Sequence, residues 1–115
     1  MTKAEIRKRF MALRDKCQNP EFETVDGMQI SKGREYNELY KLLEDTGNFD
    51  VDYADNLKGR DGYEVAADAE NLTFNDCCTA LTFLLRAERF DEGAFTESLA
   101  DGTIYKLLKR SVEVM

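Results

Sequence analysis

The sequence of 115 residues contains no histidine and no tryptophan, and it has one proline and three cysteines. The absence of histidine excludes Ser-His and Cys-His nucleophilic sites and most zinc and non-haem iron sites. No glycine-rich phosphate loop is present either. We therefore expect neither a metal nor a cofactor, and any catalysis would have to use carboxylates, tyrosines, cysteines or lysines.

The three cysteines fit neither a disulfide framework nor a metal-ligand spacing. Cys77 and Cys78 are adjacent, whereas Cys17 lies far away in the sequence. No apolar run approaches the ~20 residues of a membrane span, and the start "MTKAEIRKRF" has no apolar signal-peptide region. These features predict buried, reduced thiols and a cytoplasmic protein that makes no contact with a membrane.

The length and the composition indicate a single globular domain over residues 1–115. Hydrophobic residues make up 43% and charged residues 34% of the chain, as in soluble globular proteins. A chain of this size buries enough surface for one core without disulfides.

The net charge of −7 is concentrated in the middle of the chain. Residues 44–76 contain ten Asp or Glu and only two Lys or Arg, so this segment carries −8. An acidic protein repels phosphates, which argues against direct binding of nucleic acid. The acids of "NFDVDYADN" do not fit an EF-hand, because Tyr53 occupies the glycine position and Gly59 the terminal glutamate position.

The hydrophobic periodicity predicts a mostly α (α+β) fold, a compact bundle of four or five short helices with one small β-hairpin. Thr2 and Glu5 form a capping-box pattern before the first amphipathic helix, and Thr73 with Asp76 marks the start of a central helix. The Asp-Gly pair in "FETVDGMQI" predicts a type I′ hairpin near residues 22–30. We expect "NFDVDYADN" to form a strand or an extended loop, and "KGRDGYE" to form a surface loop.

Charged residues gather where the central helix ends, in "LTFLLRAERFDEG". Glu88 falls close to the apolar stripe of that helix, whereas Thr82, Arg86 and Arg89 form a polar ridge along one flank. One interpretation is structural: Glu88 faces inward and is held by an arginine, with Arg89 the expected partner. In the other, the ridge of Thr82, Arg86 and Arg89 binds an anionic ligand or the carboxylates of a partner.

The same stretch, followed by "GTIYKLLKR", is similar to an uncharacterised bacterial family of unknown function. The shared pattern is L-T-x-x-x-R-x-[DE]-R-F-x-x-G, then a glycine and a basic last helix, and the resemblance covers about the last two thirds of the chain. "NFDVDYADN" corresponds to an F-D-W-type segment of that family, from which Val51 and Tyr53 depart. The resemblance implies no activity.

We expect a non-enzymatic protein-binding module of bacterial or phage origin that acts through its acidic surface. The expected partner is a protein with a basic nucleic-acid channel, such as a host defence nuclease inhibited in the manner of an anti-CRISPR protein. The alternatives are a structural or homo-oligomeric domain and a small enzyme that uses carboxylates. The expected partner-binding residues are Asp50, Asp52, Asp55, Thr82, Arg86 and Arg89. The residues expected to be structural are Glu88, Phe90 and Gly93.

Overall fold

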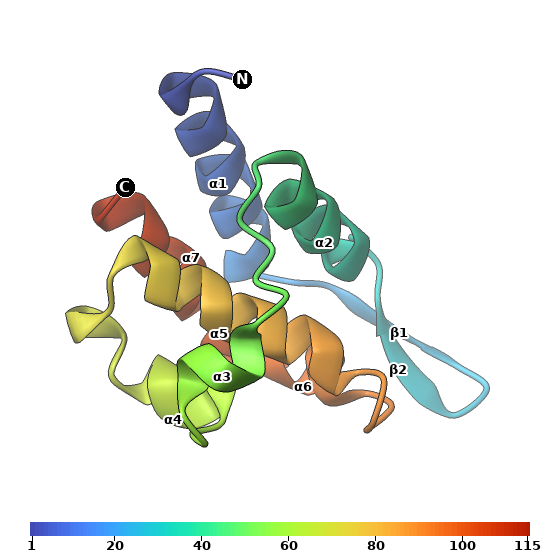
Figure 1. Cartoon of the computed structure of the whole chain (residues 1–115). Helices are drawn as coiled ribbons and strands as arrows, with labels where there is room; N and C mark the ends of the chain where they lie inside the picture. Colours follow the sequence, from blue (N-terminus) through green and yellow to red (C-terminus); the bar gives the residue numbers. More distant parts are fainter.

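A computed structural model describes all of residues 1–115 and shows seven α-helices, one short 3-10 helix and one β-hairpin (Figure 1). The elements, in chain order, are α1 (Lys3–Gln18), β1 (Phe22–Val25), β2 (Met28–Ser31), α2 (Glu35–Asp45), α3 (Tyr53–Leu57), α4 (Gly62–Ala67), η1 (Ala69–Asn71), α5 (Phe74–Ala87), α6 (Ala94–Ala100) and α7 (Thr103–Glu113). The predicted fold class is confirmed.

The starts of two long helices follow from local side-chain bonds. The hydroxyl of Thr2 accepts the N–H of Glu5 at 3.2 Å at the start of α1. At the start of α5, Thr73 accepts the N–H of Asp76 and the Asp76 carboxylate accepts the N–H of Thr73, both at 3.1 Å. Each bond satisfies an amide that the first turn of a helix leaves without a partner.

Helix α5 lies in the middle of the molecule and packs against α2, α3, α4, α6 and α7 (Figure 1). Eight of its residues are buried, so the neighbouring elements cover more of its surface than a single apolar stripe. Its leucines belong to one continuous core of 22 buried residues, to which the other long helices contribute. The three cysteines are buried in this core and form no disulfide, as predicted.

The hairpin is the one element that projects from the helices (Figure 1). Strands β1 and β2 pair antiparallel, with Phe22 opposite Ser31 and Val25 opposite Met28. Asp26 and Gly27 form the turn with φ of 52° and 80°, the left-handed conformation that a type I′ turn requires. The predicted hairpin is therefore confirmed.

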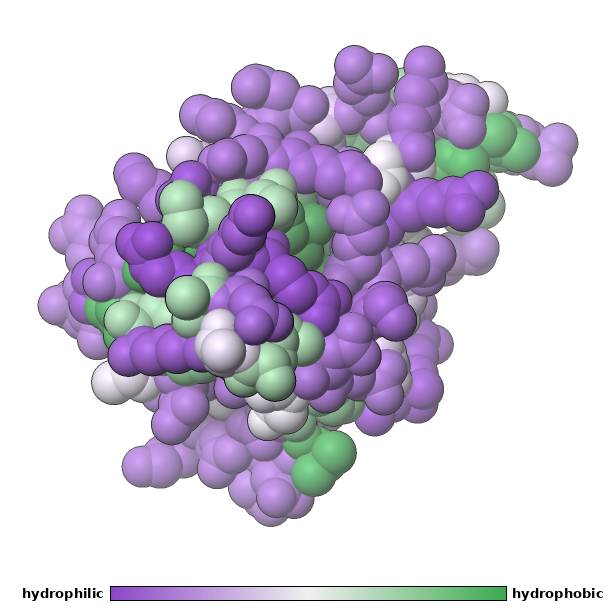
Figure 2. All heavy atoms as spheres, turned by 90° about the horizontal axis from the view of Figure 1, so that it is seen from above, coloured by the Kyte–Doolittle hydropathy of each residue, from purple (hydrophilic) through white to green (hydrophobic).

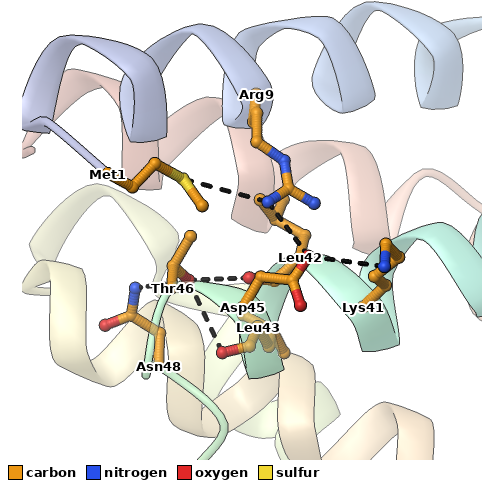
Figure 3. A network of polar contacts seen from close by, with 8 residues as sticks. All are labelled: Met1, Arg9, Lys41, Leu42, Leu43, Asp45, Thr46 and Asn48. Atoms are coloured by element: carbon orange, nitrogen blue, oxygen red, sulfur yellow. Dashed lines mark hydrogen bonds and ion pairs between the residues drawn. The ribbon is translucent and has the colours of Figure 1, made fainter.

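Helices α1 and α2 are joined where α2 ends (Figure 3). Asp45 forms ion pairs with Arg9 at 3.2 Å and with Lys41 at 3.7 Å. Thr46 donates a hydrogen bond to the carbonyl of Leu42 at 2.7 Å and so satisfies one of the last carbonyls of the helix.

Two segments between α2 and α5 differ from the sequence prediction. Residues 53–57 form helix α3 rather than a strand or extended loop, and Gly62 begins helix α4 rather than lying in a surface loop. Gly62 is buried, and a Cβ there would lie 2.5 Å from the Phe83 ring, so glycine permits close packing of α4 on α5. These short helices raise the number above the predicted four or five. None of the helices is both long enough and apolar enough to cross a membrane.

Candidate functional site

The candidate site comprises the acidic segment of residues 44–76 and the adjoining end of α5. Asp50 is the acid that ties this segment to α5. Its carboxylate accepts hydrogen bonds from the hydroxyl of Thr79 at 2.6 Å, the amide of Asn56 at 2.8 Å and the N–H of Asp52 at 3.0 Å. Asp50 is thus occupied within the protein, in contrast to the partner-binding role predicted for it.

The same bonds control the ionisation of Asp50. Partial burial alone would raise its pKa, but the hydrogen bonds from Thr79, Asn56 and Asp52 outweigh that effect and hold the pKa of Asp50 below its usual value. Asp50 is therefore ionised at neutral pH and is a weak general base.

Thr82 is fully buried, so the predicted polar ridge does not exist on the surface. Its hydroxyl donates to the carbonyl of Cys78 at 2.8 Å and accepts the N–H of Asp50 at 3.2 Å. The loop that holds Asp50 covers this flank of α5. The prediction that Thr82 contacts a partner is therefore wrong. The hydrophobic periodicity of α5 shows which side chains face the core, but it does not show that the loop with Asp50 packs on the flank that contains Thr82.

Arg86 and Arg89 differ in their surroundings. The guanidinium of Arg86 is half-buried 5.1 Å from the centre of the Phe49 ring, a cation–π contact. Arg89 is exposed and forms no ion pair. Of the expected ridge, Arg89 alone lies free on the surface.

Glu88 is held by backbone amides and not by an arginine. Its two carboxylate oxygens accept the N–H of Gly93 at 2.7 Å and the N–H of Phe95 at 3.0 Å. Both amides lie at the start of α6, where N–H groups lack helical partners and a negative charge is favourable. The structural role of Glu88 is thus supported, but the prediction that Arg89 is its partner is wrong.

The other two residues expected to be structural differ from each other. Gly93 has φ of +94° between α5 and α6, a conformation that favours glycine. Phe90 has 86% of its surface exposed and takes no part in the core. The structural role predicted for Phe90 is therefore wrong.

Nine of the ten acids of the acidic segment are exposed, and only Asp50 is half-buried. Four exposed acids bond within the protein: Asp45 binds Arg9 and Lys41, Asp61 and Asp76 cap helices, and Asp68 binds Asn71. The five others have no side-chain partner, and they are Glu44, Asp52, Asp55, Glu64 and Glu70. Val51, in the same segment, is 76% exposed.

The cysteines are not placed to act as nucleophiles. Burial raises the pKa of each cysteine thiol to about 12, so thiolate nucleophiles do not form at neutral pH. No group of three or more Cys, Asp or Glu side chains lies close enough together to hold a metal ion. A hollow of about 460 Å³ adjoins Asp50 and the start of α5, and its lining is mainly polar.

The fold and the site together define a small, mostly helical domain with an acidic surface. Residues 6–115 match the Family of unknown function (DUF6508), and the chain belongs to that family. This agrees with the resemblance to an uncharacterised family, whereas the motif and the bacterial origin stay predictions. Comparison with curated proteins and with solved structures found no match.

Proposed function

We propose that this protein is a non-catalytic protein-binding module whose acidic surface contacts a basic, nucleic-acid-binding surface of another protein. The observation that carries the proposal is the set of five exposed carboxylates without partners inside the protein. These acids form no side-chain bond within the protein, and exposed acids attract a basic partner and accelerate its association. Val51, the residue before Asp52, adds an exposed apolar side chain.

Inhibition of a host defence nuclease is the specific form of the proposal. Exposed carboxylates can compete with nucleic acid for a basic channel through charge alone. Such an inhibitor needs neither a bound metal nor a nucleophilic side chain. The carboxylates of Asp50 and Glu88 already accept hydrogen bonds within the protein, and this structural use supports a non-catalytic role.

The test is retention of a partner from lysate by immobilised protein, compared between two neutralised variants. The first variant changes the five unpartnered acids, as Glu44→Gln, Asp52→Asn, Asp55→Asn, Glu64→Gln and Glu70→Gln. The control changes five exposed acids elsewhere that also lack side-chain partners, as Glu21→Gln, Glu23→Gln, Asp91→Asn, Glu92→Gln and Glu97→Gln. Both sets change the net charge by the same amount.

We expect a specific partner to bind the wild type and the control but not the first variant. Excess duplex DNA should release that partner from the wild type, because DNA and the acidic surface compete for one basic site. Equal loss of binding in both variants would show a general effect of net charge and would contradict the proposal. So would retention of the partner by the first variant.

A further inference from the structure

A polar hollow of about 460 Å³ lies where the loop between α2 and α3 passes the start of α5 (Figure 1). Six polar side chains line it, and they are Asn48, Asp50, Asn56, Asn75, Asp76 and Thr79. Hydrophilic residues also predominate on the face of the molecule in Figure 2, where hydrophobic side chains form only small groups. Recognition at the hollow therefore depends on charge and hydrogen bonds and not on an apolar contact.

The lining of this hollow carries negative charge and no positive charge. Asp50 and Asp76 contribute two carboxylates, and no lysine or arginine lines the hollow. Four other hollows of comparable size each have at least one lysine or arginine in their lining. A cation therefore meets opposite charge, and no like charge, in the lining of this hollow alone among the five.

The side chain of Asn48 offers the hollow an acceptor, because its donor is used within the protein. The hydroxyl of Thr46 donates to the carbonyl of Leu42 at 2.7 Å, so its oxygen must accept from the amide nitrogen of Asn48 at 2.8 Å. The side-chain carbonyl oxygen of Asn48 has no hydrogen bond within the protein and remains free to accept.

The groups around Asp50 are also left as acceptors. An ionised carboxylate can only accept, so Asn56 and Thr79 must both donate to Asp50, at 2.8 Å and 2.6 Å. The amide oxygen of Asn56 stays free. Asp76 accepts the N–H of Thr73 with one carboxylate oxygen, and its other oxygen has no hydrogen bond within the protein.

The start of α5 does not make the hollow a site for anions. Thr73 and Asp76 satisfy amides of the first turn through the capping box, and the Asp76 carboxylate lines the hollow. Among the lining side chains only Asn75 keeps N–H donors that no internal bond uses. A ligand that fits the hollow must therefore bring both positive charge and hydrogen-bond donors.

We propose that this hollow receives the guanidinium group of an arginine side chain from a protein partner. Guanidinium carries a positive charge and five planar N–H donors, which suit several separate oxygens better than the three donors of a lysine ammonium. Asn48, Asn56 and Asp76 supply the oxygens, and Asp50 adds charge and orients Asn56. The source of the arginine rests on the proposed function, in which the partner is basic, and the hollow adds one defined contact to the charge of the exposed acids.

The test is an NMR titration of the full chain with N-acetyl-arginine amide, which presents the side chain without a charged backbone. The controls are N-acetyl-citrulline amide, in which an uncharged urea replaces the guanidinium, and N-acetyl-lysine amide. We expect the arginine derivative to shift the backbone amide signals of Asn48, Asp50 and Asn56. It should bind about tenfold more tightly than the citrulline derivative and about threefold more tightly than the lysine derivative.

Two pairs of variants locate the binding. Asp76→Asn removes one charge from the hollow and keeps an oxygen for the cap, and Asp61→Asn makes the same change at the cap of α4, outside the hollow. Asn75→Lys places an ammonium at an exposed position of the hollow, and Asn37→Lys adds the same charge at an exposed position of α2. Each hollow variant should weaken binding about threefold or more, and each control should change it little.

Four results would overturn the proposal: no shifts around the hollow, equal binding of either control compound, equal weakening by a variant and its control, or larger shifts of the same signals with calcium chloride at the same concentration. None of the five acids changed in the partner assay lines the hollow. Binding of the arginine derivative therefore tests the hollow alone, and retention of a partner tests the proposed function alone.

Discussion

The Oε1 atom of Glu88 lies 3.0 Å from the backbone nitrogen of Phe95, and this bond fixes the start of α6 to the end of α5. The second carboxylate oxygen binds the N–H of Gly93. One side chain therefore satisfies two amides across a turn between helices. In the charged cluster at the end of α5, the carboxylate of Glu88 therefore binds backbone amides and forms no ion pair with Arg86 or Arg89.

Glu88→Ala should lower the free energy of unfolding by about 1–2 kcal/mol, because two helix-start amides lose their acceptor. Glu88→Gln, which keeps one good acceptor oxygen, should cost less. Arg89→Ala should change stability by less than about 0.5 kcal/mol, since the arginine is exposed and unpaired. Urea unfolding measures all three, and equal destabilisation by Arg89→Ala would contradict this assignment.

The lowered pKa of Asp50 predicts a pH dependence of stability. A carboxyl group whose pKa is lower in the folded state contributes stability above its unfolded pKa, close to 3.8, and loses that contribution as pH falls through the folded pKa. Asp50→Asn should therefore flatten the fall in stability below about pH 5. Urea unfolding from pH 6 to pH 3 measures the slope.

Asp52→Asn is the matched control for this effect. It removes the same charge from the same loop but no side-chain hydrogen bond. If both variants flatten the slope equally, general charge repulsion and not the hydrogen bonds of Asp50 explains the pH dependence.

The cysteines should resist thiol reagents in the native protein. Cys17, Cys77 and Cys78 have 1%, 0% and 3% of their surface exposed, and burial raises the pKa of each to about 12. We expect no labelling at pH 8 over minutes and labelling of all three thiols in urea. Mass spectrometry counts the modified residues, and rapid native labelling of any of them would contradict the buried positions.

Gly62→Ala should destabilise the protein by about 1–3 kcal/mol, because the added methyl group overpacks the contact between α4 and α5. The obstacle is chiefly the Phe83 ring. The double variant Gly62→Ala with Phe83→Leu should lose less stability than the sum of the two single changes. Strict additivity of the two costs would show that the ring is not the obstacle.

The features that the sequence predicts correctly depend on residues close together in the chain. The caps at Thr2 and Thr73 and the turn at Asp26 each involve partners within three residues. The short helices α3 and α4 span five and six residues, too few to show a period: residues 53–57 were not predicted as a helix, and "EVAADAENL" could be read only as a short helix or irregular structure.

The errors at the candidate site arise from contacts that the sequence does not display. The burial of Thr82 depends on Asp50, 32 residues away. Glu88 binds two backbone amides, and because nearly every residue has such an amide, the sequence does not indicate which ones a carboxylate binds. The nearby arginine side chains led instead to the prediction of an ion pair. The glycine of "DEG" was nevertheless a usable signal, because an acid shortly before a glycine that precedes a helix is placed to bind the helix-start amides.

Helices α1 and α7, the first and the last of the chain, pack against each other (Figure 1). During synthesis, α1 therefore emerges from the ribosome long before α7, which supplies part of the surface that covers its apolar stripe. The native core closes only after α7 has been made, so folding depends on a contact between sequence-distant segments and should be slower than in bundles of neighbouring helices. Until then Phe10, Leu13 and Cys17 are open to aggregation or to a chaperone.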